Sequence, residues 1–169
     1  DIILSDQDTI GLFHFTDDAL SLVMPRLISN VSYLQHKDMD LTLQEAGCPI
    51  KGFSSQKTLN YYQKSIETIR SLLGEERLVC LDSEDGANLS TLERSLKYLR
   101  KKYPEKKILI VLDNTYNLQD FGHLEPTPRI TRIVDLEKAL TIKYQCTMFS
   151  SAEYRKYDIS NTTKMRLPT

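Results

Sequence analysis

One short segment constrains the fold of this chain more than any other: five aliphatic residues, Ile108 to Leu112, that lead directly into Asp113. A strand with one wet face alternates apolar and polar residues, whereas an unbroken aliphatic run indicates a strand buried on both faces. Such strands are typical of a parallel sheet with helices on each side. The segment therefore predicts an α/β fold in which Asp113 emerges at the tip of a buried strand.

The rest of the chain alternates between strand-like and helix-like segments. Short runs rich in β-formers predict strands at residues 9–15, 77–82, 108–113 and 145–150. Apolar residues at helical spacing predict helices at residues 20–34, 57–73, 90–103 and 130–144. The polar residues 36–56, which contain breakers, suggest a connecting loop with room for a short helix. This order predicts a three-layer α/β domain with a mostly parallel central sheet.

Local signals predict several helix ends. Thr16-Asp17-Asp18 can start the first helix, with Thr16 or Asp18 as its cap. Ser90-Thr91-Leu92-Glu93 has the form of a capping box, S-x-x-E. Gly74 is a suitable residue just beyond a helix, and Pro104 stops the helix before it.

Composition excludes some classes of protein. The 169 residues fit one domain, and a net charge of −1 gives no overall electrostatic attraction to nucleic acid or to a membrane. No apolar run approaches the roughly 20 residues of a membrane helix, and no secretory signal is visible. The three cysteines form no C-x-x-C pair, and Cys80 and Cys146 are expected to be buried thiols. We therefore expect a protein of the reducing cytoplasm.

The carboxyl ends of the predicted strands carry the candidate site residues, because chemistry in open parallel sheets collects there. Asp113 could orient a hydrated Mg²⁺ held by nucleotide phosphates, although a turn-forming aspartate has the same pattern. Asp17 or Asp18 could activate water for attack on a γ-phosphate. Glu153 or Arg155, beyond the last strand, could sense that phosphate, or the segment could be a solvated strand exit.

A loop between the third predicted strand and the last helix could contact DNA. It holds Phe121 and His123, and Arg129 and Arg132 flank the start of the helix. Basic and aromatic groups on such a loop can grip a nucleic-acid backbone, while ordinary surface charge remains the alternative. The three histidines are far apart and show no metal-ligand spacing. The sequence contains no G-x-x-x-x-G-K-[ST], the loop that cradles phosphates in P-loop ATPases.

Four motifs together resemble the DnaB-type replicative DNA helicases, particularly their phage-like members. They are Leu12 to Asp18 with Met24 to Ile28, Ile110 to Leu118, Ile133 to Tyr144 with Cys146 to Arg155, and Met165 to Thr169. The resemblance implies an incomplete RecA-like P-loop NTPase fold over residues 1–169, cut from a longer protein, without the Walker A region and the C-terminal end. It also implies ATP and Mg²⁺ as cofactors.

By this resemblance Asp17 matches the catalytic acid, with Asp18 as the near alternative, Asp113 matches the Walker B aspartate, and residues 120–129 match a DNA-facing loop. Two departures stand out: the family's catalytic acid is usually Glu, and its polar sensor, often Gln, falls at Ala152. The implied function is an ATP-driven hexameric motor on single-stranded DNA in a bacterium or a phage-infected bacterium, with a primase or a loader as further partner. A RecA-like module without catalysis, or another RecA-like ATPase of the recombinase or clock type, fits the same motifs.

Overall fold

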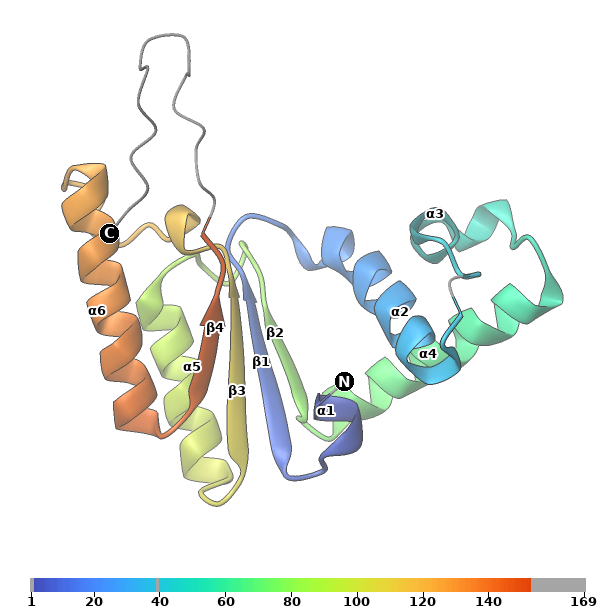
Figure 1. Ribbon diagram of the computed structural model, residues 1–169, viewed down its shortest axis with the longest axis horizontal. Helices are drawn as coiled ribbons and strands as arrows, with labels where there is room; N and C mark the ends of the chain where they lie inside the picture. The colour runs from blue at the N-terminus through green and yellow to red at the C-terminus, as the bar shows by residue number, and fades with distance from the viewer. Residues whose placement is uncertain (1, 39, 153–169) are drawn as a thin grey trace, which may run out of the picture.

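The computed structural model describes residues 2–38 and 40–152, and its four strands form one parallel sheet (Figure 1). The strands are β1 (Thr9–Phe15), β2 (Leu78–Leu81), β3 (Lys107–Asp113) and β4 (Thr147–Ser150). The helices are α1 (Ile2–Ser5), α2 (Leu20–His36), α3 (Leu43–Gly47), α4 (Gln56–Gly74), α5 (Leu89–Lys102) and α6 (Pro126–Tyr144). Two 3-10 turns, η1 (Pro49–Lys51) and η2 (Thr115–Asn117), complete the described elements.

The sheet has the strand order β2-β1-β3-β4, so β1 and β3 are its central strands. Along the β1–β3 pair, Phe15 lies opposite Asp113, and along the β3–β4 pair, Leu112 lies opposite Ser150. The four strands therefore end at one common edge, as the sequence predicted.

Helices lie on both sides of the sheet, with α5 and α6 along one face and α2 and α4 on the other side, where α3 packs against α2 (Figure 1). On that second side the cover is partial, since Leu109 and Val111 of β3 are only half-buried. The α5–α6 side holds the larger core, in which Leu12, Ile110 and Leu112 of the sheet and Leu92 and Leu96 of α5 have no solvent exposure. A separate cluster around Ile69 and Leu72 fills the α2–α4 side. The predicted three-layer α/β architecture is confirmed.

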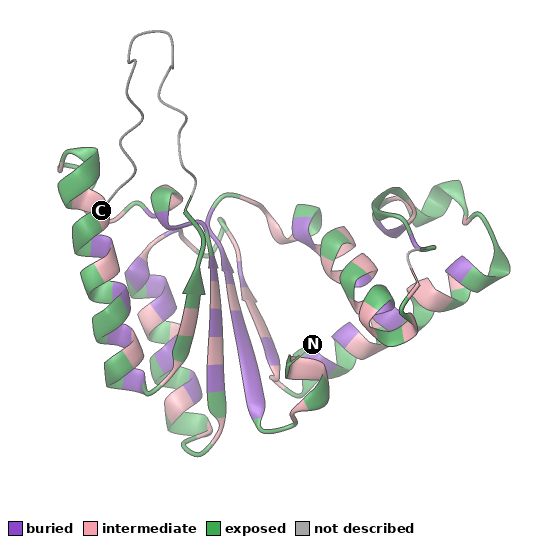
Figure 2. Ribbon diagram, viewed as in Figure 1, coloured by how far each residue is buried: buried purple, intermediate pink, exposed green. Residues whose placement is uncertain are grey.

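Burial is uneven across the sheet (Figure 2). The inner strand β1 is buried at six of its seven positions, whereas β4 is mostly exposed and its Phe149 is 61% exposed. Within residues 2–38 and 40–152, no strand pairs with the outer edge of β4. Strand β1 is thus buried within the domain, whereas β4 is an exposed edge strand.

The predicted ends of α4, α5 and α6 were wrong, because residues close to the predicted ones cap or begin these helices. The cap of α5 is Asn88, whose side chain accepts from the Thr91 amide, so Ser90 lies inside the helix. Gly74 is the last residue of α4 and Glu75 is the C-cap. Helix α6 begins at Pro126 rather than Ile130, since a proline without an N–H is well suited to the first turn.

Helix α2 continues through Pro25 to His36, and the expected short helix in the 36–56 connection is α3. Helix α3 begins with a capping box that the sequence analysis did not predict, since Thr42 and Glu45 bond reciprocally. Cys80 and Cys146 are half-buried, and burial raises the pKa of Cys80 to about 11. Among the described residues, no helix is long and apolar enough to cross a membrane.

Candidate functional site

The tips of the two strands β3 and β4 bring a carboxylate and a hydroxyl together. The Ser151 hydroxyl donates to Asp113 Oδ1 at 2.5 Å, and both side chains are exposed at the sheet edge. Backbone bonds fix this pair: Ser151 N–H donates to Leu112 O at 3.0 Å, and Thr115 N–H donates to Ser151 O at 2.9 Å. Asp113 therefore has one oxygen engaged by Ser151 and a second oxygen available to a ligand, on a rigid strand end.

Thr16 joins the ends of β1 and β3. Its amide donates to Asp113 O at 2.8 Å, and its hydroxyl accepts from the Asn114 amide at 2.8 Å and donates to Asn114 O at 2.9 Å. The Asp113–Asn114 peptide bond is cis. Because Thr16 and Asn114 are both buried, these bonds are shielded from water and hold the two strand exits together.

Asp17 and Asp18 follow Thr16 directly, so the Thr16 bridge brings the first predicted acid to the neighbourhood of Asp113. Asp17 is exposed, and no described side chain or amide bonds to its carboxylate. Asp18 instead forms an ion pair with Arg26 at 3.0 Å. Neither Thr16 nor Asp18 caps α2, whose N-cap is Ala19.

The tip of β2 supplies the support for α2. Asp82 Oδ2 accepts from the Leu20 amide at 2.9 Å, while its other oxygen accepts from Glu84 N–H. The hydrogen bond from the Leu20 amide is the main cause that lowers the pKa of Asp82. The lowered pKa keeps this carboxylate ionised at the positive end of the helix. Asp82 is thus engaged in placing α2 and the acidic turn before it.

A buried carboxylate from α6 lies behind the same edge. Glu137 is 6% exposed; its Oε1 accepts from the Thr115 hydroxyl at 3.1 Å and its Oε2 from the Ser150 hydroxyl at 3.2 Å. Burial raises its pKa, and the two hydroxyl bonds oppose that effect. Sequence reasoning missed this residue, although its position four residues after Ile133 and three before Leu140 places it on the buried face of the helix.

His14 is fully buried on β1. Its Nε2 bonds to Gly86 O at 3.1 Å, and its Nδ1 has no partner among the described residues. Burial lowers its pKa, while the Gly86 carbonyl and the charges of Asp85 and Asp120 raise it. The imidazole therefore belongs to the packing beneath the edge.

The predicted DNA-facing loop is tied down at several points. Asp120 Oδ2 accepts from the Leu89 amide at 2.9 Å, and the Arg129 guanidinium donates to the carbonyls of Asp120 and Leu118. Phe121 has a positive φ of 55°, which is strained for a bulky residue. Arg129 thus holds the loop, a role that the sequence did not indicate.

His123, Arg132 and Asp135 line a hollow of about 510 Å³, together with the apolar side chains of Phe121, Leu124, Pro128 and Leu136. The hollow lies where this loop meets α6. Both basic residues are exposed, so they are available to a partner.

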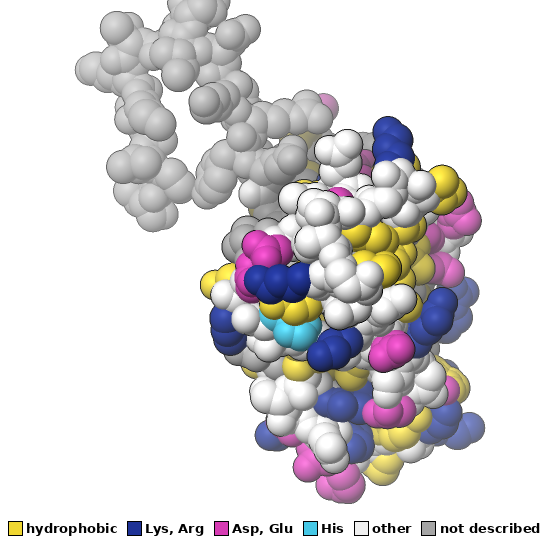
Figure 3. Space-filling view, turned by 90° about the vertical axis from the view of Figure 1, so that its right-hand side faces the viewer, with side chains coloured by type: hydrophobic (Ala, Val, Ile, Leu, Met, Phe, Trp, Pro, Cys, Tyr) yellow, Lys and Arg dark blue, Asp and Glu magenta, His cyan; other side chains and the backbone are white. Residues whose placement is uncertain are grey.

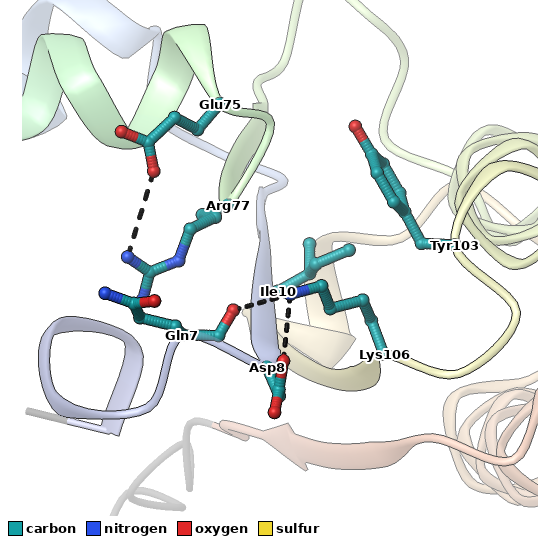
Figure 4. A pocket seen from close by; sticks show the side chains of 7 residues that line it. All are labelled: Gln7, Asp8, Ile10, Glu75, Arg77, Tyr103 and Lys106. Atoms are coloured by element: carbon teal, nitrogen blue, oxygen red, sulfur yellow. Dashed lines mark hydrogen bonds and ion pairs between the residues drawn. The ribbon is translucent and has the colours of Figure 1, made fainter.

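Two other surfaces of the described chain carry no further candidate site residues. A hollow of about 360 Å³ lies at the opposite, amino-terminal edge of the sheet, where Lys106 already bonds to Gln7 O and Asp8, and Arg77 lies 4.0 Å from Glu75 (Figure 4). On the face formed by α2, α3 and α4, basic and acidic side chains are interspersed without a continuous basic patch among the residues described (Figure 3). Neither surface adds to the residues at the strand tips.

Two predicted residues, Glu153 and Arg155, lie outside the described part of the chain. Within the part that is described, no three His, Cys, Asp or Glu side chains gather in a metal cluster. Asp113 alone still suits Mg²⁺, since this ion keeps several waters and is commonly bound through one or two carboxylates and the phosphates of a substrate. The donor set therefore fits a metal that arrives with a nucleotide.

No family model and no curated protein matches the chain, but solved structures with the same fold exist. A structure described as a DnaB-like replicative helicase and its interactions with primase is 15% identical with a TM-score of 0.70, and the match covers 88% of this chain and 32% of that one. A second structure, described as an ATPase domain, is 15% identical with a TM-score of 0.73, over 90% of this chain and 50% of that one. The chain thus spans about a third and a half of their lengths, and at this identity the likeness concerns the fold. This chain has the RecA-like α/β fold of DnaB-type helicase ATPase domains, which confirms the resemblance expected from its sequence.

Proposed function

We propose that this chain is part of the motor core of an ATP-dependent replicative DNA helicase. The motor would be a ring-shaped hexamer that moves along single-stranded DNA, in the cytoplasm of a bacterium or a phage-infected bacterium. One observation carries the proposal: in a fold shared with helicase ATPase domains, the Asp113–Ser151 pair lies at a strand edge that Thr16 joins to the acidic turn of Asp17.

We assign Asp113 to hold Mg²⁺ through water and Asp17 to activate the attacking water. Bound Mg²⁺ neutralises charge on the phosphates of ATP. Asp113 has an exposed oxygen for this task, and Asp17 has an unpaired exposed carboxylate among the described residues. Asp18 is the weaker alternative base, because Arg26 already holds it. Glu153 and Arg155 stay assigned to sensing the γ-phosphate.

We assign the phosphate-binding loop to residues outside these 169, since the sequence contains no G-x-x-x-x-G-K-[ST]. The 169 residues would then be one part of a RecA-like motor domain. The outer edge of β4, unpaired within the described residues, leaves room for a further strand beside Ser151. A loop that follows such a parallel strand would open at the same edge as Asp113.

We assign contacts with the DNA backbone to His123 and Arg132, which are exposed beside the apolar hollow. Arg129 then contributes indirectly, by holding the loop through two carbonyls. A primase or a loader is a further expected partner, since one helicase of similar fold is described together with its interactions with primase.

The test uses the natural gene product that contains this chain and measures ATP hydrolysis with and without single-stranded DNA. Asp113→Asn keeps an oxygen for Ser151 but removes the charge, so kcat should fall by about a hundredfold or more, as expected for a lost metal ligand. Glu105→Gln is the matched control, because Glu105 is an exposed carboxylate just before the opposite end of the same strand. Undiminished hydrolysis by Asp113→Asn would refute the assignment.

A second function, a RecA-like binding or assembly module without catalysis, is favoured by the missing phosphate-binding motif. It predicts no ATP hydrolysis by the natural gene product, and retained binding of its partner in Asp113→Asn. The same preparations therefore separate the two functions.

A further inference from the structure

Glu137 is the one buried carboxylate of α6, and none of the roles assigned above uses it. Its two oxygens accept from two hydroxyls that belong to different strand exits, Thr115 after β3 and Ser150 at the end of β4. No cation among the described residues bonds to it. A carboxylate buried in this way is costly, because two neutral hydroxyls replace its hydration only in part.

The two hydroxyl groups stand next to the residues of the candidate nucleotide edge. Thr115 is two residues after Asp113, and its amide donates to Ser151 O at 2.9 Å. Ser150 immediately precedes Ser151, whose hydroxyl lies on Asp113. Glu137 therefore bonds to a residue close to each member of the Asp113–Ser151 pair, from the side of the sheet on which α6 lies.

The other end of the same helix carries the loop. Arg129, in the first turn of α6, donates to the Leu118 and Asp120 carbonyls, and Arg132 lines the hollow beside the loop. Ile133, one turn before Glu137, is fully buried in the core, so this part of the helix is packed firmly against the sheet. Helix α6 thus contacts the loop through Arg129 near its start and the two strand ends through Glu137 near its middle. A rigid helix with both contacts can transmit a displacement of the loop to the strand ends.

We propose that Glu137 is a positioning residue, through which α6 sets the geometry of the Asp113–Ser151 pair and links that pair to residues 118–125, the part of the predicted DNA-facing loop that precedes α6. The inference rests on the proposed ATPase function. It requires two accepting or donating atoms at the position of the carboxylate, and it does not require a negative charge.

Three variants test the inference in the natural gene product. Glu137→Leu removes both bonds at similar volume, and Glu137→Gln retains two polar atoms to which rotated hydroxyls can bond. Glu93→Leu is the matched control: Glu93 of α5 accepts from Lys143 Nζ at 2.7 Å and from Tyr144 OH at 3.0 Å, away from the strand tips. Hydrogen exchange of the Thr115 and Ser151 amides gives a readout that does not depend on activity.

In Glu137→Leu we expect those two amides to exchange on the order of tenfold faster, since two hydrogen bonds are lost. We expect kcat to fall roughly ten- to hundredfold with KM for ATP little changed, because the pair is misplaced rather than removed. Stimulation of hydrolysis by DNA should fall as well. Glu137→Gln should restore both readouts to within a few-fold, and Glu93→Leu should leave them as in the wild type.

Unchanged exchange and unchanged kcat in folded Glu137→Leu would overturn the inference. So would equal losses in Glu137→Leu and Glu137→Gln, which would mean that charge matters rather than position. Equal losses in Glu137→Leu and Glu93→Leu would mean a purely structural role and would overturn it too. Asp113→Asn in the same preparations keeps the two proposals apart: if it leaves hydrolysis intact, the ATPase assignment fails, while the exchange result still decides whether Glu137 positions the strand tips.

Discussion

Replacing Thr16 with valine should destabilise this chain by about 2 kcal/mol, although the two side chains have nearly the same shape. The Thr16 side chain is buried, and its hydroxyl accepts from the Asn114 amide at 2.8 Å and donates to the Asn114 carbonyl at 2.9 Å. Valine leaves that amide buried without a partner, and an unsatisfied buried donor costs about 1–3 kcal/mol. The loss therefore comes from polarity rather than from a cavity.

Urea unfolding monitored by circular dichroism measures this effect, with an unchanged m-value as the sign of an unchanged mechanism. For a chain of this size, about 2 kcal/mol corresponds to a fall in Tm of roughly 4–8 °C. Thr131→Val is the control, since the Thr131 side chain is exposed on α6 and surface changes stay within about 0.5 kcal/mol. If Thr16→Val unfolds with the free energy of the wild type, the Thr16 bridge does not hold the strand exits together.

Two other changes test the packing of the sheet, one at its amino-terminal edge and one in its core. Arg100→Lys should lower the free energy of unfolding, measured in urea, by about 2 kcal/mol. The Arg100 guanidinium donates to four carbonyls, and one ammonium cannot reach all of them: those of Pro104, Lys106, Tyr144 and Gln145. A free energy of unfolding equal to that of the wild type would contradict this. His14→Gln should flatten the loss of stability between about pH 7 and pH 5. Burial lowers the pKa of His14, so below about pH 6.5 the unfolded chain binds a proton that the folded chain does not, and folding weakens as the pH falls. Unfolding curves at both pH values check this, and an equal pH dependence in the variant would exclude His14 as its source.

Local sequence determined the class of the fold. Short β-rich runs alternating with helical periodicity predicted parallel strands with helices packed beside them. The aliphatic run before Asp113 predicted a strand buried on both faces, but Ile108, Ile110 and Leu112 are buried on one face while Leu109 and Val111 on the other are only half-buried. Parallel strands end together, so the grouping of Asp17, Asp113 and Ser151 at one edge was predictable from their positions in the chain.

The tertiary structure decided which groups at that edge are free and which are engaged. The cap of α2 was mispredicted because Asp82, distant in sequence, accepts from the Leu20 amide that Asp18 could have reached. Arg129 was predicted to contact DNA, yet its guanidinium binds two carbonyls of the loop before it.

Contacts between residues distant in sequence had no local signal. Thr16 meets Asn114 only because β1 and β3 are neighbours in the strand order, which periodicity does not specify. Glu137 reads as a polar interruption of an apolar helix face until packing brings it to Thr115 and Ser150. Sequence specifies the period of each element, whereas a buried hydrogen bond depends on the register between elements, and only the packed sheet sets that register.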